Sequence, residues 1–186
     1  MVQLVLYFLF CGLFLYGCAE STLPKGKQTT LGLYVTAKEA HEKWQADPDN
    51  VKILDVRTPE EYVFVGHAPM AHNIPLLFFK EKWYAQEKGS VMMMNPDFVS
   101  QVKKKCKPTD TILVMCRSGG RSAKAVNLLA NEGFKQAYNV IDGFEGGIVK
   151  EENSYYRGKR KINGWKNSGA PWTYKVNPKR AYPSVL

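Results

Sequence analysis

One cysteine of this 186-residue chain stands where its thiolate would be stabilised. Residues 111–115 are apolar and β-rich, and a loop with two consecutive glycines follows them before a helical segment begins. In such a strand–loop–helix unit the loop N–H groups turn inward, and the helix N-terminus adds positive potential. The thiolate is the nucleophilic form of cysteine, so this setting predicts nucleophilic chemistry on an anionic substrate. The loop consists of Cys116, Arg117, Ser118, Gly119, Gly120, Arg121 and Ser122.

The composition of this loop separates Cys116 from an ordinary core cysteine. Free cysteine is often buried for packing alone. Here Arg117 and Arg121 add positive charge, and Gly119 and Gly120 permit the positive φ angles that a tight cradle needs. We therefore expect Cys116 to be the catalytic residue and the loop after it to hold the substrate anion.

The elements that must position this loop alternate between helices and strands. Thr36 and Glu39 form a capping box, and Thr58 followed by Pro59 marks a second helix start. Helices are expected at about 36–46, 58–66, 97–105 and 122–132, and strands at 51–56, 72–75, 111–115 and 138–141. This alternation predicts an α/β fold with a mostly parallel sheet and helices on both faces.

Further motifs accompany the cysteine loop along the chain. Residues 55–57 read DVR, residues 60–62 read EEY, residues 66–75 read GHAPMAHNIP and residues 142–147 read DGFEGG. Together with residues 116–121, which fit the pattern C-x-x-G-x-R, these segments resemble, in the same order, the single-domain rhodanese family of sulfurtransferases.

The resemblance covers residues 33–150, and its departures lie outside the cysteine loop. Met70 and Phe144 stand where the family pattern has glycines, and residues 76–94 are long enough to be an insertion. The resemblance implies a doubly wound α/β domain with a parallel five-stranded sheet and helices on both faces.

The resemblance also implies a reaction through a persulfide. Cys116 would take the outer sulfur of thiosulfate, or of a persulfide donor, and pass it to a nucleophilic thiol on a small molecule or a protein, with cyanide as acceptor in vitro. The loop amides from Arg117 to Ser122 would cradle the persulfide, and Arg117 and Arg121 would hold the anionic donor. No metal and no organic cofactor is needed.

Three polar residues are expected to support the site. Asp55, at the end of a strand, is expected to hold neighbouring loop amides in place. Arg57 is either the partner of Asp55 or a donor at the mouth of the pocket. His67 is expected to make a structural hydrogen bond rather than to act as a base, because a preformed thiolate requires none.

Two other classes of function remain open from the residues. A sulfur carrier without turnover, or a protein-binding module of the cell envelope, would use the same domain, although an intact Cys116 argues against a purely binding role. A cysteine phosphatase or arsenate reductase has a similar anion loop, but there the arginine lies six positions after the cysteine. Arg121 lies five positions after Cys116, and the shorter ring suits sulfur better than a tetrahedral oxyanion.

The first part of the chain predicts export. Residues 2–19 contain no charged side chain, a length between a signal-peptide core and a membrane span. The sequence LYGC that ends at Cys18 resembles a lipoprotein signal. Residues 1–19 are therefore expected to be a signal peptide, a lipoprotein signal with lipid on Cys18, or a membrane anchor, and the protein is expected in the bacterial periplasm or cell envelope. Residues 20–32 are polar and are expected to form a linker.

The composition predicts a folded domain with a basic extension. Hydrophobic residues make up 45% and charged residues 23% of the chain, as in soluble globular proteins. Four cysteines are too few for a disulfide-dense scaffold. The net charge is +9, and residues 151–186 carry eight Lys or Arg against two Glu. This basic, aromatic C-terminal extension is expected to pack on the domain and to face anionic lipid or an acidic partner, while nucleic acid is not expected outside the cytoplasm.

Overall fold

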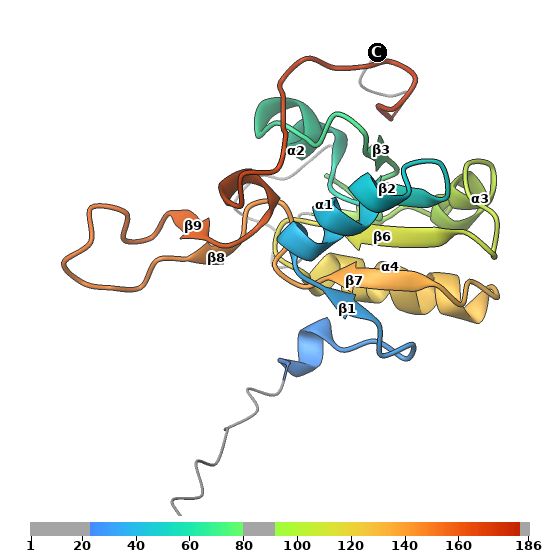
Figure 1. Ribbon diagram of the computed structural model, residues 1–186, viewed down its shortest axis with the longest axis horizontal. Helices are drawn as coiled ribbons and strands as arrows, with labels where there is room; N and C mark the ends of the chain where they lie inside the picture. Colours follow the sequence, from blue (N-terminus) through green and yellow to red (C-terminus); the bar gives the residue numbers. More distant parts are fainter. Residues whose placement is uncertain (1–22, 80–91, 183–186) are drawn as a thin grey trace, which may run out of the picture.

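Five parallel strands form the central sheet, in the order β1-β7-β6-β2-β3 (Figure 1). The computed structural model describes residues 23–79 and 92–182. The strands are β1 Tyr34–Val35, β2 Val51–Asp55, β3 His72–Asn73, β6 Thr111–Met115 and β7 Ala137–Val140. β2 and β6 pair over their full length, from Val51 with Thr111 to Asp55 with Met115. The predicted parallel five-stranded sheet is confirmed.

Helices cover both faces of this sheet, as predicted. They are α1 Ala37–Ala46, α2 Pro59–Phe64, α3 Phe98–Lys103 and α4 Gly120–Asn131. On one face, Ile53 and Leu113 belong to a buried cluster with Ala40 of α1. On the other, Leu54 and Ile112 share a cluster with residues of α3 and α4. Because successive strand residues point to opposite faces, β2 and β6 must be apolar almost throughout.

The helix ends follow local sequence signals. Thr36 and Thr58 both form complete capping boxes, with Glu39 and Glu61 respectively. α4 begins two residues earlier than predicted, at Gly120. The reason is the left-handed backbone of Gly119, with φ of 97°, which turns the chain directly into the helix.

The residues before β1 lie against the domain. Lys25–Lys27 form a short 3-10 helix, η1. The Lys27 ammonium donates to the backbone oxygen of Ile141 at 2.8 Å, and the Thr30 N–H donates to Asn127 Oδ1 at 2.9 Å. The polar composition that predicts a linker here gave no sign of these contacts.

The two ends of the predicted insertion, residues 76–94, form a small ribbon. β4 Leu77–Phe79 and β5 Met92–Met94 pair antiparallel, with Leu77 opposite Met94. The central part of the insertion, 80–91, lies outside the described residues.

The C-terminal extension is partly core and partly exposed. Its strand β9 Arg160–Ile162 pairs antiparallel with β8 Gly147–Ile148, which lies just before the predicted extension 151–186, and the 3-10 helix η2 Trp165–Asn167 follows. Trp165 is fully buried in the cluster that α1 covers, as expected for an aromatic segment that packs on the domain. Tyr155, however, is 83% exposed, so that expectation is wrong for the hairpin.

Residues 170–182, here called the strap, run back over the domain. The Thr173 N–H and carbonyl pair with His67, and the Asn73 N–H donates to the Arg180 carbonyl at 2.7 Å. The strap thereby supplies an acceptor to the edge strand β3. Within residues 23–79 and 92–182, no helix is long and apolar enough to span a bilayer. The predicted signal or anchor, residues 1–19, lies outside the described residues.

Candidate active site

Cys116 lies at the carboxyl edge of the sheet, directly after β6 and just before α4. In open parallel sheets ligands bind at this edge, outside the ends of the strands. The β6 strand is the middle of the five, so the position is flanked by loops that follow β2 and β7. The side chain of Cys116 is almost fully buried, with 1% of its surface exposed.

Two donors approach the sulfur. Gly119 N lies 3.1 Å from Cys116 Sγ, and Ser122 Oγ lies 3.3 Å from it. In the described part of the chain these are the polar partners of Sγ. Both belong to the loop and the first turn of α4, whose N-terminus carries positive potential. A sulfur anion at this position would accept hydrogen bonds from both groups.

Ser122 is held by a residue of β7. Its hydroxyl lies 2.6 Å from Asn139 Oδ1, and Asn139 Nδ2 donates to the carbonyls of Gly119 and Lys27 at 3.1 and 2.9 Å. The amide orientation of Asn139 is therefore fixed, and its oxygen faces Ser122. A hydroxyl has one proton, so Ser122 donates either to Asn139 or to the sulfur at any moment.

The backbone of the loop depends on two glycines. A Cβ on Gly119 would lie 2.2 Å from the Ile141 oxygen, and a Cβ on Gly143 would lie 2.5 Å from the Cys116 oxygen. Both also have positive φ. Gly120, by contrast, is not among the residues with positive φ. The expectation of a positive φ there is wrong, because the single left-handed turn at Gly119 suffices.

Arg121 makes a bidentate ion pair with Glu61. The two nitrogen–oxygen distances are both 2.6 Å, and the two side chains are only 16% and 12% exposed. Burial alone would raise the pKa of Glu61, but the hydrogen bonds and charge of Arg121 lower it. Burial would likewise lower the pKa of Arg121, and Glu61 raises it. Much of the Arg121 charge is thus compensated before any substrate arrives.

The supporting residues form a neighbouring cluster, not a ring around the sulfur. The carboxylate of Asp55 accepts from Arg57 Nε and Nη2, the latter at 2.6 Å, and both side chains are fully buried. Arg57 also donates to the Gly66 carbonyl, and its Cζ atom lies 4.0 Å from the centre of the Phe144 ring. Arg57 is therefore the partner of Asp55, rather than a donor at an open mouth.

His67 belongs to the same cluster. Its ring stacks on Tyr62 at 3.8 Å, and its Nδ1 lies 3.0 Å from the Tyr62 carbonyl. Burial lowers the pKa of His67, while the hydrogen bond to Tyr62 opposes the shift. Among the described residues, its contacts are with α2 and the strap.

Arg117 and Ser118 occupy the outer side of the loop. Arg117 is exposed and Ser118 is half-buried. Their backbone is tied to the following segment, because the N–H groups of Phe144 and Glu145 donate to the carbonyls of Cys116 and Arg117. Within the described ranges, no three His, Cys, Asp or Glu side chains are arranged to hold a metal ion.

The sequence interpretation missed two side chains of this site. Asn139 lies in β7 and had no polar pattern around it that would single it out. Glu61 was part of the EEY motif and of the capping box at Thr58, yet its pairing with Arg121, 60 positions away, became visible only in the fold. Because Glu61 lies three residues after Thr58, its presence was already explained by the capping box, and nothing in the sequence indicated an ion pair as well.

Fold and site together define an α/β protein with a buried thiol on a strand–loop–helix unit that stabilises anions. The Rhodanese-like domain family matches residues 36–148. The chain therefore belongs to the rhodanese-like domain family, and sulfur transfer is the broad class of chemistry that this membership supports.

Known proteins resemble this chain to different extents. Over 93 residues it is 41% identical to "Thiosulfate sulfurtransferase 16, chloroplastic" of Arabidopsis thaliana, a match that covers 50% of this chain and 70% of that protein. It is 39% identical over 93 residues to "Protein HIGH ARSENIC CONTENT 1, mitochondrial" of the same plant and spans half the length of that relative. The crystal structure of Rv0390 from M. tuberculosis matches with a TM-score of 0.61 and 26% identity, and covers 76% of this chain and 96% of that one.

Proposed function

We propose that this protein is a thiosulfate-type sulfurtransferase that works through a persulfide on Cys116. The observation that carries the proposal is the placement of Cys116 Sγ, 3.1 Å from the Gly119 amide and 3.3 Å from the Ser122 hydroxyl at the start of α4. These donors suit both a thiolate and the terminal sulfur of a persulfide.

The reaction has two displacement steps. The Cys116 thiolate attacks the outer sulfur of thiosulfate, the S–S bond of the donor breaks, and sulfite leaves with its electron pair. A thiolate acceptor then attacks the outer sulfur of the Cys116 persulfide, forming a new persulfide and releasing the Cys116 thiolate. A persulfide donor can replace thiosulfate in the first step, and cyanide can replace the thiol in the second.

The roles of the loop residues follow from their positions. Arg117 is exposed and can meet an arriving anion, whereas Arg121 is engaged with Glu61 and acts mainly by keeping the loop in shape. The loop amides from Arg117 to Ser122, with the Gly119 N–H directed at the sulfur, hold the transferred sulfur. Asp55 and Arg57 fix the adjacent loop between β2 and α2, and Arg57 also donates to the carbonyl of Gly66, the residue before His67.

The test is sulfur transfer by the full-length chain, purified with detergent to cover residues 1–19. We expect thiosulfate-to-cyanide turnover in the wild type and in Cys106→Ser, and none in Cys116→Ser. Cys106 is a matched control because it is also buried and free, and burial raises its pKa to about 11. Intact mass after thiosulfate treatment should show one added sulfur in the wild type and none in Cys116→Ser.

The same assay separates the alternatives. A stable added sulfur without turnover would identify a carrier that delivers to one protein acceptor. Because one relative has arsenic in its name, arsenate and a phosphate ester belong among the test substrates. Turnover of either one, without sulfur transfer, would overturn the proposal in favour of oxyanion chemistry.

The proposal places this activity in the cell envelope, on the basis of the uncharged residues 2–19. Mass spectrometry of the mature N-terminus from membrane and periplasmic fractions tests it. We expect cleavage before Cys18 with lipid on that cysteine, cleavage beside it, or an intact N-terminus kept in the membrane fraction as an anchor. An intact, unmodified N-terminus found only in the cytoplasmic fraction, analysed beside the other two, would contradict this location.

A further inference from the structure

A basic hairpin projects from the edge of the sheet that carries the active site (Figure 1). We call residues 147–162 the basic arm; it comprises β8, β9 and the loop between them. It leaves the body on the side to which the arrowheads of β6 and β7 point. The arm starts at the end of the segment that matches the rhodanese-like family, 36–148, and most of it lies beyond that segment.

The arm is anchored beside the catalytic loop. Phe144 and Glu145 donate their N–H groups to the carbonyls of Cys116 and Arg117, and Arg160 of β9 donates to the Gly146 carbonyl at 2.6 Å. Gly146 also packs against the chain just after β9, at the base of the hairpin. A Cβ on Gly146 would lie 2.2 Å from the Asn163 oxygen. The base of the arm and the support of the cysteine loop are therefore consecutive residues.

The side chains of the arm are positive and aromatic. Its basic residues are Lys150, Arg157, Lys159, Arg160 and Lys161, against Glu151 and Glu152. In the described part of the chain, the pair between Arg157 and Glu152, at 3.6 Å, is the salt bridge found on the arm. Positive charge is thus left available along a surface that solvent reaches.

Two tyrosines stand among these charges. Tyr155 is 83% exposed and Tyr156 is 47% exposed. Lys159 Nζ lies 4.5 Å from the centre of the Tyr155 ring, and Lys161 Nζ lies 5.8 Å from that of Tyr156. Tyr is enriched at protein interfaces, where its ring supplies contact area at low entropic cost.

A hollow at the base of the arm continues this surface towards the active site. Its lining includes Lys166, Arg160 and Lys161 together with Glu145, whose N–H group binds the Arg117 carbonyl. Arg117, whose carbonyl accepts this hydrogen bond, is itself exposed and adds a positive charge to the cysteine loop. A partner that contacts the arm would therefore lie beside residues that are hydrogen-bonded to the backbone of the cysteine loop.

We propose that the basic arm docks an acidic protein that receives the sulfur from Cys116. This inference rests on the proposed function and names its acceptor. A hairpin of this length reaches roughly 25 Å at most, far more than thiosulfate or cyanide needs. Glu145, Glu151 and Glu152 would repel a uniform phosphate backbone, whereas an acidic protein with a few basic side chains matches this mixture of charges.

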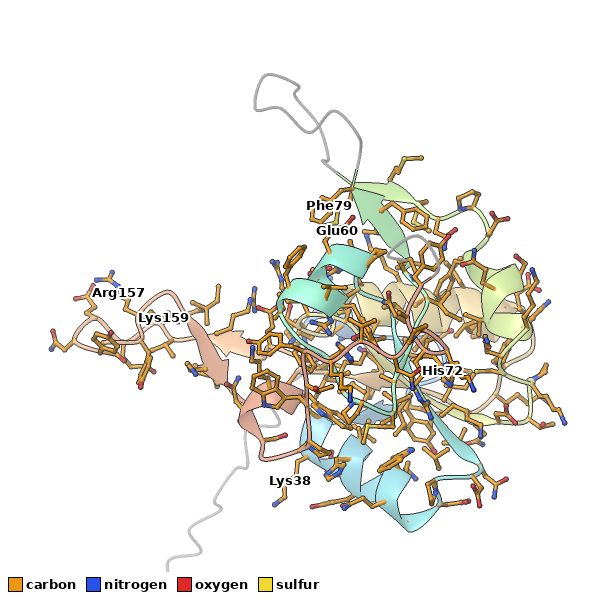
Figure 2. All side chains as sticks on the ribbon, turned by 90° about the horizontal axis from the view of Figure 1, so that it is seen from above. Lys38, Glu60, His72, Phe79, Arg157 and Lys159 are labelled. Carbon is orange, nitrogen blue, oxygen red and sulfur yellow. The ribbon has the colours of Figure 1, made fainter. Side chains whose placement is uncertain are left out.

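The probe is a short glutamate-rich peptide that ends in cysteine, compared with a glycine–serine peptide that ends in the same cysteine. Transfer from the wild-type persulfide to the acidic peptide should be about tenfold faster than to the neutral peptide at low salt, and the difference should vanish at high salt. Lys159→Glu should remove this preference. Lys38→Glu is the matched control, because it makes the same charge change on α1, away from the arm (Figure 2).

Cyanide provides the internal reference for these variants. Both should keep the wild-type rate to cyanide, since neither residue belongs to the cysteine loop. If no protein transfers sulfur to cyanide, the proposed function fails. The acidic-acceptor inference is wrong if sulfur is transferred to cyanide but the two peptides react at equal rates. It is also wrong if Lys38→Glu lowers the preference for the acidic peptide as much as Lys159→Glu does.

Two further binding measurements decide between classes of macromolecule. Wild type and Lys159→Glu are mixed with vesicles of phosphatidylcholine and phosphatidylserine, and with a single-stranded RNA oligonucleotide. We expect any binding of these probes to be equal in both proteins. Arm-dependent binding of vesicles or RNA, without a preference for the acidic peptide, would overturn the inference and assign the arm to a membrane or a nucleic acid.

Discussion

At the scale of single residues, the hydroxyl of Ser122 lies between two acceptors. Cys116 Sγ and Asn139 Oδ1 lie 3.3 and 2.6 Å from its oxygen. When the sulfur is a neutral thiol, the Ser122 hydroxyl donates to Asn139 Oδ1. When the sulfur is an anion, a charge-assisted hydrogen bond from Ser122 to the sulfur competes with the bond to Asn139. Asn139 is therefore a positioning residue that orients the Ser122 hydroxyl.

Replacement of Asn139 should change catalysis in a way that mere loss of stability would not. Asn139→Ala should lower the rate of persulfide formation about tenfold, because Ser122 loses its fixed partner. Asn139→Asp keeps an acceptor for Ser122 but adds negative charge near the sulfur, so the pH profile of the rate should move to higher pH. Stopped-flow measurement of sulfite release over a pH series tests both.

The matched control for Asn139 is Asn127, which also binds the segment before β1. Its Oδ1 accepts from the Thr30 N–H at 2.9 Å on the outside of α4. Asn127→Ala should leave the rate and its pH profile unchanged. An unshifted profile in Asn139→Asp would contradict the positioning role.

At the scale of elements, the strap closes the edge of the sheet at β3. The Asn73 N–H donates to the Arg180 carbonyl, and Arg180 Nη1 lies 3.1 Å from His72 Nε2. Burial, with the positive charges of Arg180 and Lys105, lowers the pKa of His72 to about 4 from its usual 6.5. His72, labelled in Figure 2, is therefore neutral in the folded protein at neutral pH.

This depressed pKa predicts acid sensitivity. Between about pH 6.5 and 4 the unfolded chain binds a proton at His72 and the folded chain does not, so stability is lost as pH falls through this window. His72→Gln has no such group and should lose less stability over the same range, by roughly a few degrees in Tm. Thermal unfolding of both proteins over a pH series measures this; parallel Tm curves would refute the assignment.

At the scale of the whole molecule, the C-terminal extension divides into a core part and a free part. Trp165 has no exposed surface, and its Nε1 donates to the Pro171 carbonyl at 2.8 Å. Its backbone N–H also binds the Gly143 carbonyl, next to the segment that supports the cysteine loop. The extension thus completes the core of the family domain and is hydrogen-bonded to the segment that supports the cysteine loop.

Substitutions in the two parts should differ sharply. Trp165→Ala should lower the free energy of unfolding by about 3–5 kcal/mol, because it empties a large volume in the core. Tyr155→Ala, on the exposed arm, should change it by less than about 0.5 kcal/mol. Urea unfolding followed by circular dichroism measures both; equal effects would show that the arm is not an independent projection.

The sequence by itself determined the local parts of this protein. Capping at Thr36 and Thr58, the apolar strands 51–55 and 111–115, and the cysteine loop are set by neighbouring residues, and the family motifs stand in order along the chain. Patterns of this kind depend on backbone geometry and burial within one element. The α/β class and the parallel sheet followed from their alternation.

Only the tertiary structure decided which distant groups meet. Three contacts join residues that are far apart in sequence. Glu61 pairs with Arg121, Asn139 lies within hydrogen-bond distance of the Ser122 hydroxyl, and Trp165 is buried in the cluster that α1 covers. The free energy of such contacts depends on distances and burial that the packing of the elements sets. For the same reason, the charge pattern alone could not place the basic arm. Its position beside the cysteine loop depends on residues 144 and 145, which bind the backbone of that loop and lead into the hairpin.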